Sequence, residues 1–278
     1  MKLKIAITGS SGFIGQNLYN HVGKIKEWSI LPIDRDNLQD ILTFQPDVIC
    51  HLAANPLVKD SGVQMVSSNV ALTAQILDYS KHLAKKCHLI FMSSATVYGG
   101  NIDAVSEDAV LRPNSVYAAT KIAAESLIKA YSHLGYIDYT ILRSCANVGK
   151  YCTHGVIKDL VYKLQHNSTL EVLGDYPGSC KPYIHVLDTI RAIKHCMMYK
   201  VYGTYNLATT NPVTIAQITE ILQNTMEIYK TVVWSGSTGT WKGDDQYVHL
   251  DSQALQSTGF EFLHKTSEMS IIQGVRDI

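Results

Sequence analysis

Apolar and polar positions follow two different rhythms along the first half of the chain. Short apolar runs read LKIAIT, SILPID, DVICHLAA, HLIFMSS and YTILRS, and longer helical patterns lie between them near residues 12–23, 63–85 and 115–134. Strands that alternate with helices in this way are joined by right-handed crossovers and form a parallel sheet that is buried on both faces. The pattern therefore predicts an α/β fold with a doubly wound parallel sheet.

Beyond about residue 150 the elements become shorter and the pattern loosens. We expect strands at LEVLG, PYIHV and TYNLA, and helices near residues 154–166, 187–199, 214–228 and 265–278. The elements at residues 150–181 and 210–278 are expected to form a smaller C-terminal α/β domain. The first domain then covers residues 1–149 with a returning segment at about 182–209. The Gly-rich stretch WSGSTGTWKGDD, residues 234–245, is interpreted as a surface loop or a ligand loop.

The composition excludes several classes of partner. The 278-residue chain is 46% hydrophobic and carries 24 basic and 24 acidic side chains, so its formal net charge is zero. Nucleic acid and anionic membranes usually require a basic surface, so a small ligand is the expected partner. No stretch approaches the ~20 apolar residues that cross a bilayer, and the apolar run at the N-terminus is too short for a signal peptide. We expect a soluble, cytoplasmic protein.

The cysteines form no CxxC pair and lie scattered through apolar segments, at Cys50, Cys87, Cys145, Cys152, Cys180 and Cys196. Reduced thiols in an intracellular protein fit this distribution better than a disulfide scaffold does. The spacing also lacks the paired ligands of a zinc site. No metal is expected.

A glycine-rich loop, TGSSGFIG, follows the first predicted strand and opens the first predicted helix. This is the position at which a dinucleotide-binding fold of the Rossmann type holds a pyrophosphate. Gly9 permits a tight turn, Gly12 lets the backbone approach the anion, and Gly15 allows close helix packing. The spacing is GxxGxxG. The predicted cofactor contacts in this loop are Gly9, Ser11, Gly12, Phe13, Ile14 and Gly15.

An acidic residue, Asp34, ends the second predicted strand. A carboxylate there accepts hydrogen bonds from the ribose hydroxyls and repels a 2′-phosphate, which favours NAD. Arg35 beside it could instead hold the phosphate of NADP, so both cofactors stay open, with NAD preferred. Only about a dozen residues separate Asp34 from the next strand. That leaves little room for a complete extra strand between them.

Tyr117 and Lys121 are four residues apart on a predicted helix, so both side chains lie on one face. A phenol ionises near pH 10, and to act as a base near pH 7 its pKa must fall by ~3 units, or about 4 kcal/mol. One neighbouring cation supplies about 1 to 3 units. Lys121 could supply part of this and the positive ring of an oxidised nicotinamide more. The pair therefore makes the best chemical sense beside a bound dinucleotide.

Hydroxyl side chains follow the strand HLIFMSS. Ser94 is placed to hydrogen-bond the substrate oxygen that Tyr117 would deprotonate, and Ser93 is the alternative. Thr96 is interpreted either as a contact to a neighbouring sugar hydroxyl or as a buried turn residue.

Together these motifs resemble the extended branch of the short-chain dehydrogenase/reductase superfamily, the NAD-dependent epimerase/dehydratase family, and in particular its UDP-glucose (UDP-galactose) 4-epimerase-like members. The resemblance covers nearly the whole chain. It is carried by TGSSGFIG, HLAAN, SSNVALT, SSATVYGG, YAATK, LRSCANVG, THGVI, KPYIHVLD and WKGD, in that order.

The resemblance implies a role for each matching position. Ser94, Tyr117 and Lys121 would be catalytic, and Lys121 would also hold the nicotinamide ribose. The further cofactor contacts it implies are Asp34, Arg35, Leu52, Ala53, Ala54, Asn69, Ser93, Tyr117 and Lys121. The substrate contacts it implies are Thr96, Asn147 and Lys181 at the sugar and diphosphate, Thr153 and His154 at the uridine, and Trp241 or Lys242.

Two departures from the family pattern affect the diphosphate contacts. Lys181 stands where many relatives carry arginine, which replaces a bidentate fork with a point charge. Asn147 lies four residues after Arg143, where three is commoner. The resemblance further implies a UDP-linked nucleotide sugar as substrate, and a homodimer that pairs through the two long helices near residues 63–85 and 115–134.

The reaction must be inferred from the site, because this fold hosts many chemistries. Related dehydratases place an Asp-Glu pair directly after the residue equivalent to Ser94, whereas this chain has Ala95 and Thr96, neither of which transfers a proton. The favoured hypothesis is a nucleotide-sugar 4-epimerase that works through a 4-keto sugar with bound NAD. The alternatives are an NADPH-dependent reductase of a 4-keto nucleotide sugar and a non-catalytic dinucleotide-binding sensor.

Overall fold

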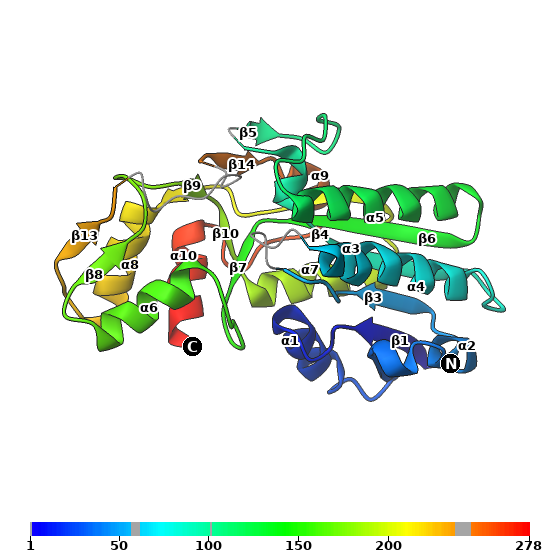
Figure 1. The fold of residues 1–278 in the computed structure, drawn as a ribbon. Helices are drawn as coiled ribbons and strands as arrows, with labels where there is room; N and C mark the ends of the chain where they lie inside the picture. Colours follow the sequence, from blue (N-terminus) through cyan, green and yellow to red (C-terminus); the bar gives the residue numbers. More distant parts are fainter. Residues whose placement is uncertain (1, 57–61, 101, 237–245) are drawn as a thin grey trace. The chain divides into compact units, whose positions relative to one another are not determined.

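The computed structural model describes residues 2–56, 62–100, 102–236 and 246–278 (Figure 1). The chain divides into two compact units. The first unit contains Met1–Gly99, Val110–Ser144 and Ile190–Asn206, and the second contains Gly100–Ala109, Cys145–Thr189 and Leu207–Ile278.

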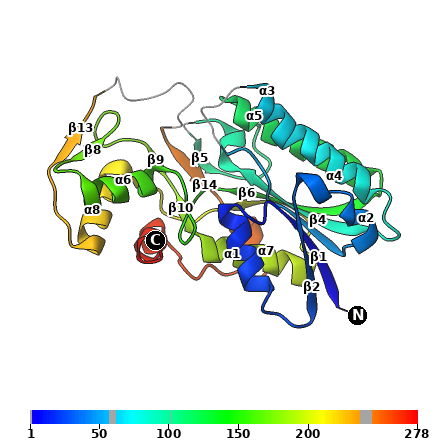
Figure 2. The ribbon, with the colours of Figure 1, turned by 60° about the horizontal axis from the view of Figure 1, so that its bottom comes forward.

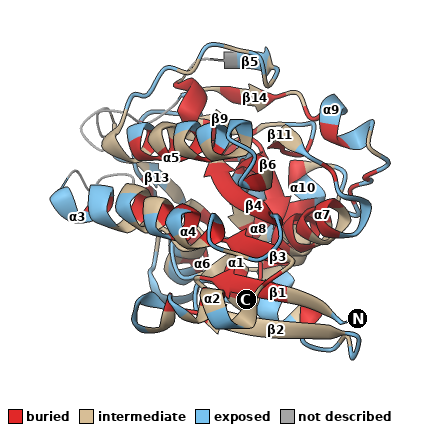
Figure 3. Ribbon diagram, turned by 90° about the vertical axis from the view of Figure 1, so that its right-hand side faces the viewer, coloured by how far each residue is buried: buried red, intermediate tan, exposed pale blue. Residues whose placement is uncertain are grey.

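The first unit is built on a six-stranded sheet with the strand order β11-β6-β4-β3-β1-β2. Its strands are β1 (Leu3–Thr8), β2 (Trp28–Ile33), β3 (Val48–His51), β4 (Cys87–Ser94), β6 (Ile137–Ser144) and β11 (Gly203–Leu207). The registers from β2 through β1, β3 and β4 to β6 are parallel. Figure 3 shows that β3 and β4 are buried along their lengths. The predicted α/β fold with a parallel sheet is confirmed.

Helices cover both faces of this sheet (Figure 2). On one face lie α2 (Asp40–Phe44), α3 (Val63–Val66), α4 (Leu72–Ser80) and α5 (Val116–His133), and a π-helical turn, η2 (Ser67–Ala71), joins α3 to α4. On the other face lie α1 (Phe13–Val22) and the C-terminal part of α7 (Val186–Tyr199), whose Met197 contacts Cys50 of β3. Two 3₁₀ turns, η1 (Arg35–Asn37) and η3 (Ala95–Tyr98), follow β2 and β4. Ile76, Ile128 and Leu89 belong to the shared core.

The edge of the sheet beyond β1 confirms the short segment expected after Asp34. β2 is the last strand, and the chain returns from it through η1 and the five-residue α2 directly to β3, which pairs with β1. No further strand lies between β2 and β3 in the described chain. Pro32 is tolerated in β2 because an edge strand needs hydrogen-bond donors on one side only.

The described part of the second unit contains four two-stranded sheets. β7 (Ala146–Val148) pairs with β10 (Tyr183–His185), β8 (Leu170–Val172) with β13 (Val232–Trp234), and β5 (Ile102–Val105) with β14 (Val248–Leu250), all in parallel. β9 (Cys180–Lys181) and β12 (Val213–Thr214) are antiparallel. Its helices are α6 (Val156–His166), α8 (Ile215–Met226), α9 (Gln253–Gln256) and α10 (Ser267–Arg276).

Apolar faces of the helices form the core of the second unit. Five of these side chains are at most 1% exposed: Leu160 and Leu164 of α6, Ile218 and Leu222 of α8, and Ile271 of α10. α8 begins with a capping box, in which Thr214 accepts from the Gln217 N–H and the Gln217 side chain accepts from the Thr214 N–H. Within the described ranges, no helix has the length and apolar character that a bilayer span requires.

Candidate active site

The glycine loop has the geometry of a cradle that only glycine permits. Gly9 has a φ of +68°, and a Cβ on it would lie 2.7 Å from the backbone nitrogen of Ala53. A Cβ on Gly15 would lie 1.9 Å from the carbonyl oxygen of Gly9. Side chains at these two positions are therefore excluded by backbone atoms.

The N-terminus of α1 opens directly from this loop. Its N-cap is Gly12, whose N–H donates to the Gly9 carbonyl (3.0 Å) and which offers no side chain to cap the helix. Phe13 and Ile14 stand in the first turn, where backbone N–H groups have no partner within the helix. Ser11 is exposed and its carbonyl accepts from Gln16. The loop and helix end fit an anionic pyrophosphate.

The segment after β3 runs against the glycine loop. The Leu52 N–H donates to the Thr8 carbonyl (3.3 Å), and the Ala53 N–H donates to the Thr8 hydroxyl (3.2 Å). Ala54 follows as a partly buried residue. The structure thus brings Leu52 and Ala53 against Gly9, which lies more than forty positions earlier in the sequence.

Asp34 and Arg35 are both exposed where β2 ends. The Asp34 N–H donates to Asn37 Oδ1 (2.7 Å), which fixes the turn that follows the strand. Arg35 Nη2 donates to the hydroxyl of Ser68 in the π-helical turn (2.9 Å). The guanidinium is therefore held toward η2.

Asn69 lies in the same π-helical turn and is 2% exposed. Its Nδ2 donates to Thr120 Oγ1 (3.0 Å) and to the Asn55 carbonyl (3.3 Å), and its Oδ1 accepts from the Asn55 N–H (2.7 Å). Thr120 in turn donates to the Tyr117 carbonyl (2.7 Å). The side chain predicted to contact the cofactor thus links the segment after β3 to helix α5.

Helix α5 starts at a point that places Tyr117 in its first turn. Ser115 is the N-cap, and its hydroxyl accepts from the Ala118 N–H (3.2 Å). Lys121 lies one turn further along and is 4% exposed. Its Nζ donates to the Met92 carbonyl of β4 (2.8 Å) and lies 5.8 Å from the centre of the Tyr117 ring. The predicted pairing of phenol and ammonium on one face is present.

The two serines that end β4 have different partners. The Ser94 hydroxyl hydrogen-bonds the Tyr117 phenol, whereas Ser93 is buried and donates to Glu125 Oε1 (2.5 Å). Both the N–H and the hydroxyl of Thr96 donate to Ser94 Oγ (3.3 and 3.0 Å). These bonds occupy the acceptor side of Ser94 and leave its single hydrogen for Tyr117. Thr96 therefore orients Ser94.

Burial controls the pKa of the tyrosine in the protein alone. Desolvation raises the pKa of Tyr117 from 10.0 to about 12, against a smaller opposite effect of the Ser94 hydrogen bond. In the protein alone, desolvation is the largest effect on the pKa of Tyr117, while the Lys121 ammonium donates to the Met92 carbonyl. A second positive charge is needed before this phenol can ionise near neutral pH.

Burial also acts on the lysine. Desolvation lowers the pKa of Lys121 from 10.5 to about 8, and the nearby Glu125 carboxylate opposes this. Lys121 Nζ lies 4.6 Å from the centre of the Phe91 ring, which offers a favourable surface for a cation. Lys121 therefore stays positive at neutral pH.

The predicted substrate residues Asn147, Thr153, His154 and Lys181 belong to the second unit. Asn147 in β7 accepts from the Thr189 hydroxyl (2.5 Å), and its Nδ2 donates to the Cys145 carbonyl (3.0 Å). Thr153 and His154 are exposed and hydrogen-bonded to each other (3.1 Å). Lys181 ends β9 opposite Val213 of β12. Lys242, Trp241 and most of the Gly-rich loop at 234–245 lie outside the described residues.

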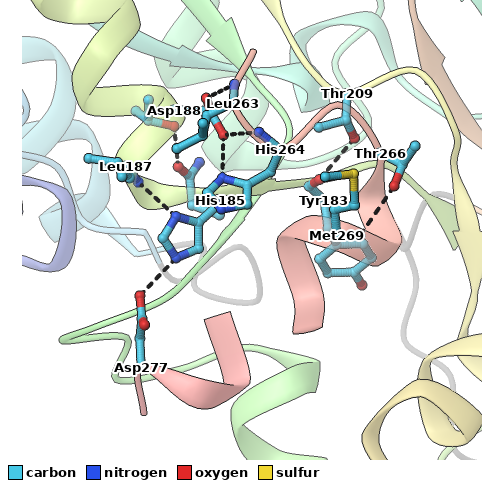
Figure 4. A network of polar contacts seen from close by, with 12 residues as sticks. Tyr183, His185, Leu187, Asp188, Thr209, Leu263, His264, Thr266, Met269 and Asp277 are labelled. Carbon is cyan, nitrogen blue, oxygen red and sulfur yellow. Dashed lines mark hydrogen bonds and ion pairs between the residues drawn. The ribbon is translucent and has the colours of Figure 1, made fainter. Parts of the chain in front are cut away.

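The KPYIHVLD segment anchors a polar network in the second unit (Figure 4). Asp188 is fully buried and accepts from the Leu263 N–H (2.6 Å) and from the N–H (3.0 Å) and Nδ1 (2.7 Å) of His264. His185 lies 4.5 Å from the His264 ring and hydrogen-bonds Asp277 through Nε2 (2.9 Å). The segment thereby holds the region before α10 and the end of the chain.

The motifs of the first unit recur in a known family. A model of the NAD dependent epimerase/dehydratase family matches residues 5–208. The chain belongs to this family. The match includes the glycine loop, the strand end with Ser94 and the helix with Tyr117 and Lys121, which confirms the resemblance predicted from the sequence.

Relatives within the family carry several activities. UDP-glucose 4-epimerase of Mycoplasma genitalium is 27% identical, and the match covers 72% of this chain and 72% of that protein. GDP-6-deoxy-D-mannose reductase of Pseudomonas aeruginosa is 25% identical, with 84% of this chain and 83% of that protein covered. A UDP-glucuronic acid 4-epimerase from Bacillus cereus, solved with a fluorinated UDP-glucuronic acid and NAD, has the same fold. Its TM-score is 0.89 at 22% identity, over 99% of this chain and 98% of that chain.

Sequence reasoning missed Glu125, which accepts from Ser93 directly behind the site. A signal was present, because Glu125 continues the four-residue spacing from Tyr117 through Lys121 on one helix face. A fully buried carboxylate is rare in proteins unless cations or hydrogen-bond donors surround it.

Proposed function

We propose that this protein is a nucleotide-sugar 4-epimerase that interconverts UDP-glucose and UDP-galactose type sugars through a 4-keto intermediate. The observation that carries the proposal is the hydrogen-bonded set of Ser94, Tyr117 and Thr96 at the end of β4, with Lys121 one turn along α5. It provides one proton acceptor for a sugar hydroxyl. Ala95 and Thr96 stand where a dehydratase needs an acid and a base, so the set fits epimerisation better than elimination of water.

NAD fits the residues of the first unit. The glycine cradle and the N-terminus of α1 would hold the pyrophosphate, because backbone atoms alone line the space that a Cβ would fill. Asp34 would accept hydrogen bonds from the ribose hydroxyls. The guanidinium of Arg35 donates instead to the Ser68 hydroxyl. When bound, NAD supplies a reversible two-electron acceptor for C4 of the sugar.

The chain's own residues handle the proton. Tyr117 would accept the proton of the sugar 4-hydroxyl and later return it to the same oxygen. The Ser94 hydroxyl would hydrogen-bond that oxygen and Tyr117, and its orientation is set by Thr96. Lys121 would stabilise the phenolate as a buried cation and hold the nicotinamide ribose.

The nucleotide end of the substrate would be held by the second unit. Asn147 and Lys181 are proposed to contact the diphosphate, and Thr153 and His154 the uridine. UDP-linked sugars are favoured because the Bacillus cereus relative of the same fold was solved with one. A homodimer that pairs through α3, α4 and α5 stays a prediction. The 86% exposure of Val63 supports it, and sedimentation velocity tests it.

The test is a direct assay of purified protein with UDP-galactose or UDP-glucose and no added cofactor. We expect interconversion, and we expect Tyr117→Phe to reduce its rate by about 10²- to 10⁴-fold. Tyr162→Phe on the exposed surface of α6 is the matched control and should leave the rate unchanged. UDP-N-acetylglucosamine and UDP-glucuronic acid are assayed in parallel. No interconversion of any of these sugars by the folded protein would contradict the proposal.

A second candidate is an NADPH-dependent reductase of a 4-keto nucleotide sugar. It is favoured by Arg35 beside Asp34 and by the similarity to the Pseudomonas aeruginosa reductase. Stoichiometric consumption of NADPH with a 4-keto nucleotide sugar, and no interconversion of UDP-sugars, would decide for this candidate.

A further inference from the structure

A carboxylate lies completely buried one helical turn behind Lys121. Glu125 is 1% exposed, and three side chains surround its two oxygens. Oε1 accepts from the Ser93 hydroxyl (2.5 Å) and from Arg143 Nε (3.1 Å), and Oε2 accepts from Arg143 Nη2 (2.7 Å). Lys129 Nζ stands 3.8 Å from Oε2 at the surface side. The pair with Arg143 is a bidentate contact, which fixes the plane of the carboxylate.

Arg143 is itself held on its other side. It comes from β6, is 1% exposed, and donates through Nη1 to the Tyr98 hydroxyl (2.8 Å). Tyr98 donates onward to Asn206 Oδ1 (2.7 Å), and the guanidinium lies 5.0 Å from the centre of the Tyr98 ring. The ion pair therefore connects α5, β4, η3, β6 and the end of β11 in one hydrogen-bonded set.

The charges of Glu125 and Arg143 balance each other, so Lys121 leaves these buried groups with one net positive charge. Glu125 is negative, Arg143 is positive, and Lys121 adds a second buried positive charge one turn away. The other groups that face Lys121 are neutral: the Met92 carbonyl and Phe91 ring of β4, the Tyr117 phenol, and His51 of β3. Burial lowers the pKa of His51 to about 3, so its ring carries no charge near neutral pH. Glu125 is the one anion that acts on Lys121 among these described groups.

We propose that Glu125, held by its ion pair with Arg143, is a positioning residue for the active site. Its carboxylate keeps Lys121 charged beside Tyr117 and fixes helix α5 to strand β4, which carries Ser94. The role in the reaction rests on the proposed function. Glu125 acts in two ways. The carboxylate attracts the ammonium through the helix interior, and the Ser93 contact ties the end of β4 to α5 immediately before Ser94.

The sign of the expected effect follows from the charges. Glu125 favours the protonated form of Lys121, so removal of its charge lets desolvation act unopposed and lowers the pKa of Lys121 below the value of about 8 in the intact protein. Glu125→Gln keeps the size of the side chain and an oxygen for Ser93. Its risk is the unpaired Arg143, so Glu125→Gln combined with Arg143→Gln is the second variant, in which neither charge is left alone.

The experiment titrates Lys121 in the full chain without substrate. Protein labelled with ¹³C at the lysine ε carbons is followed by NMR over pH, and the Lys121 resonance is assigned by its loss in Lys121→Met. We expect the titration midpoint of Lys121 in Glu125→Gln to be lower than in the wild type by about one pH unit or more. The double variant should shift it in the same direction by less, because a repelling charge is removed as well. Glu220→Gln, on the exposed face of α8, is the matched control and should shift nothing.

The activity of the same variants provides the second readout. If the protein epimerises UDP-sugars, the high-pH limb of kcat/KM should move down in Glu125→Gln in step with the NMR midpoint. A folded Glu125→Gln or double variant with an unshifted Lys121 midpoint would overturn the proposal and leave Glu125 a structural residue. A shifted midpoint in a protein that converts no sugar would keep the electrostatic role and refute the proposed function alone.

Discussion

Each unit contains a buried polar cluster that ties a helix to other segments of the chain. The two clusters use different charged groups. In the first unit the cluster joins Glu125 to Arg143 and extends to Ser93 and Tyr98. In the second unit it joins Asp188 to His264, and His185 to Asp277 (Figure 4). The first cluster ties α5 to strands β4 and β6, and the second ties α10 and Asp277 to the segment after β10.

The difference lies in which charges depend on pH. Arginine is protonated at every accessible pH, and Arg143 with Glu125 therefore remains an ion pair across the neutral range. A histidine side chain, in contrast, can change its charge at accessible pH values. Burial, and then the proximity of His264, lower the pKa of His185, while Asp277 opposes this. The ion pair of Arg143 and Glu125 thus keeps its charges across the neutral range, whereas the lowered pKa of His185 means that its cluster loses stability as the pH falls.

The largest effect is expected when the ion pair of Arg143 and Glu125 is broken. Arg143→Met leaves the Glu125 carboxylate buried and unpaired, and we expect the free energy of unfolding to fall by about 3–5 kcal/mol. Urea denaturation measures it. Glu125→Gln combined with Arg143→Met should recover most of the loss, since no charge is then left alone. A loss below about 1 kcal/mol in the single variant would mean that the pair is not the structural centre of the first unit.

In the second unit the matching change is Asp188→Asn. An amide NH₂ would face the N–H groups of Leu263 and His264, which leaves buried donors unpaired, and we expect a loss of about 2–3 kcal/mol by the same urea assay. Asp159→Asn on the exposed side of α6 is the control and should change stability by less than about 0.5 kcal/mol. Equal effects at both positions would contradict the importance given to the buried network.

The third change tests the free-energy cost of burying the Lys121 ammonium. The pKa of Lys121 is lowered from 10.5 to about 8, so the unfolded chain holds a proton that the folded protein releases between these values. The stability of the wild type should therefore rise with pH through this window. Lys121→Met removes the cost and should stabilise the protein at pH 7 by about 2 kcal/mol while activity is lost. A variant as stable as the wild type at both ends of the window would refute this.

The smallest change concerns the end of the chain. Asp277→Asn removes the carboxylate that raises the pKa of His185 and should cost about 0.5–1 kcal/mol at neutral pH. Because the folded pKa of His185 lies below 6.5 and would fall further in the variant, the difference between the two proteins should grow as the pH falls below 6.5. Thermal unfolding at several pH values checks this. A difference that shrinks in acid would reverse the assigned sign.

The sequence predicts the first unit more fully than the second. The run LKIAIT coincides with β1, and HLIFMSS with β4 apart from its first residue, because strands buried on both faces are continuous apolar runs. In the second unit β9 and β12 have two residues each, too few for any periodicity, and both were missed. The π-helical turn at Ser67–Ala71 was also hidden within one long helical pattern.

For the candidate site, residue types were easier to predict than partners. The spacing of Tyr117 and Lys121 was sufficient to place them on one face, since helical geometry alone decides it. Ser93 and Ser94 could not be separated in the sequence, because both end the same strand; only the packing of α5 directs Ser93 to Glu125. Asn69 was expected at the cofactor, and its side-chain contacts to Asn55 and Thr120 depend on chain segments that the sequence does not bring together.

The central claim is that the Tyr117 phenol becomes usable near neutral pH only when a second positive charge joins Lys121. Ultraviolet difference titration of wild type against Tyr117→Phe, with and without saturating NAD, measures the ionisation of this one phenol. Without NAD we expect a midpoint at about 12, and with NAD a midpoint that moves down toward neutral pH. The same midpoint in both titrations, in protein shown to bind NAD, would contradict the account.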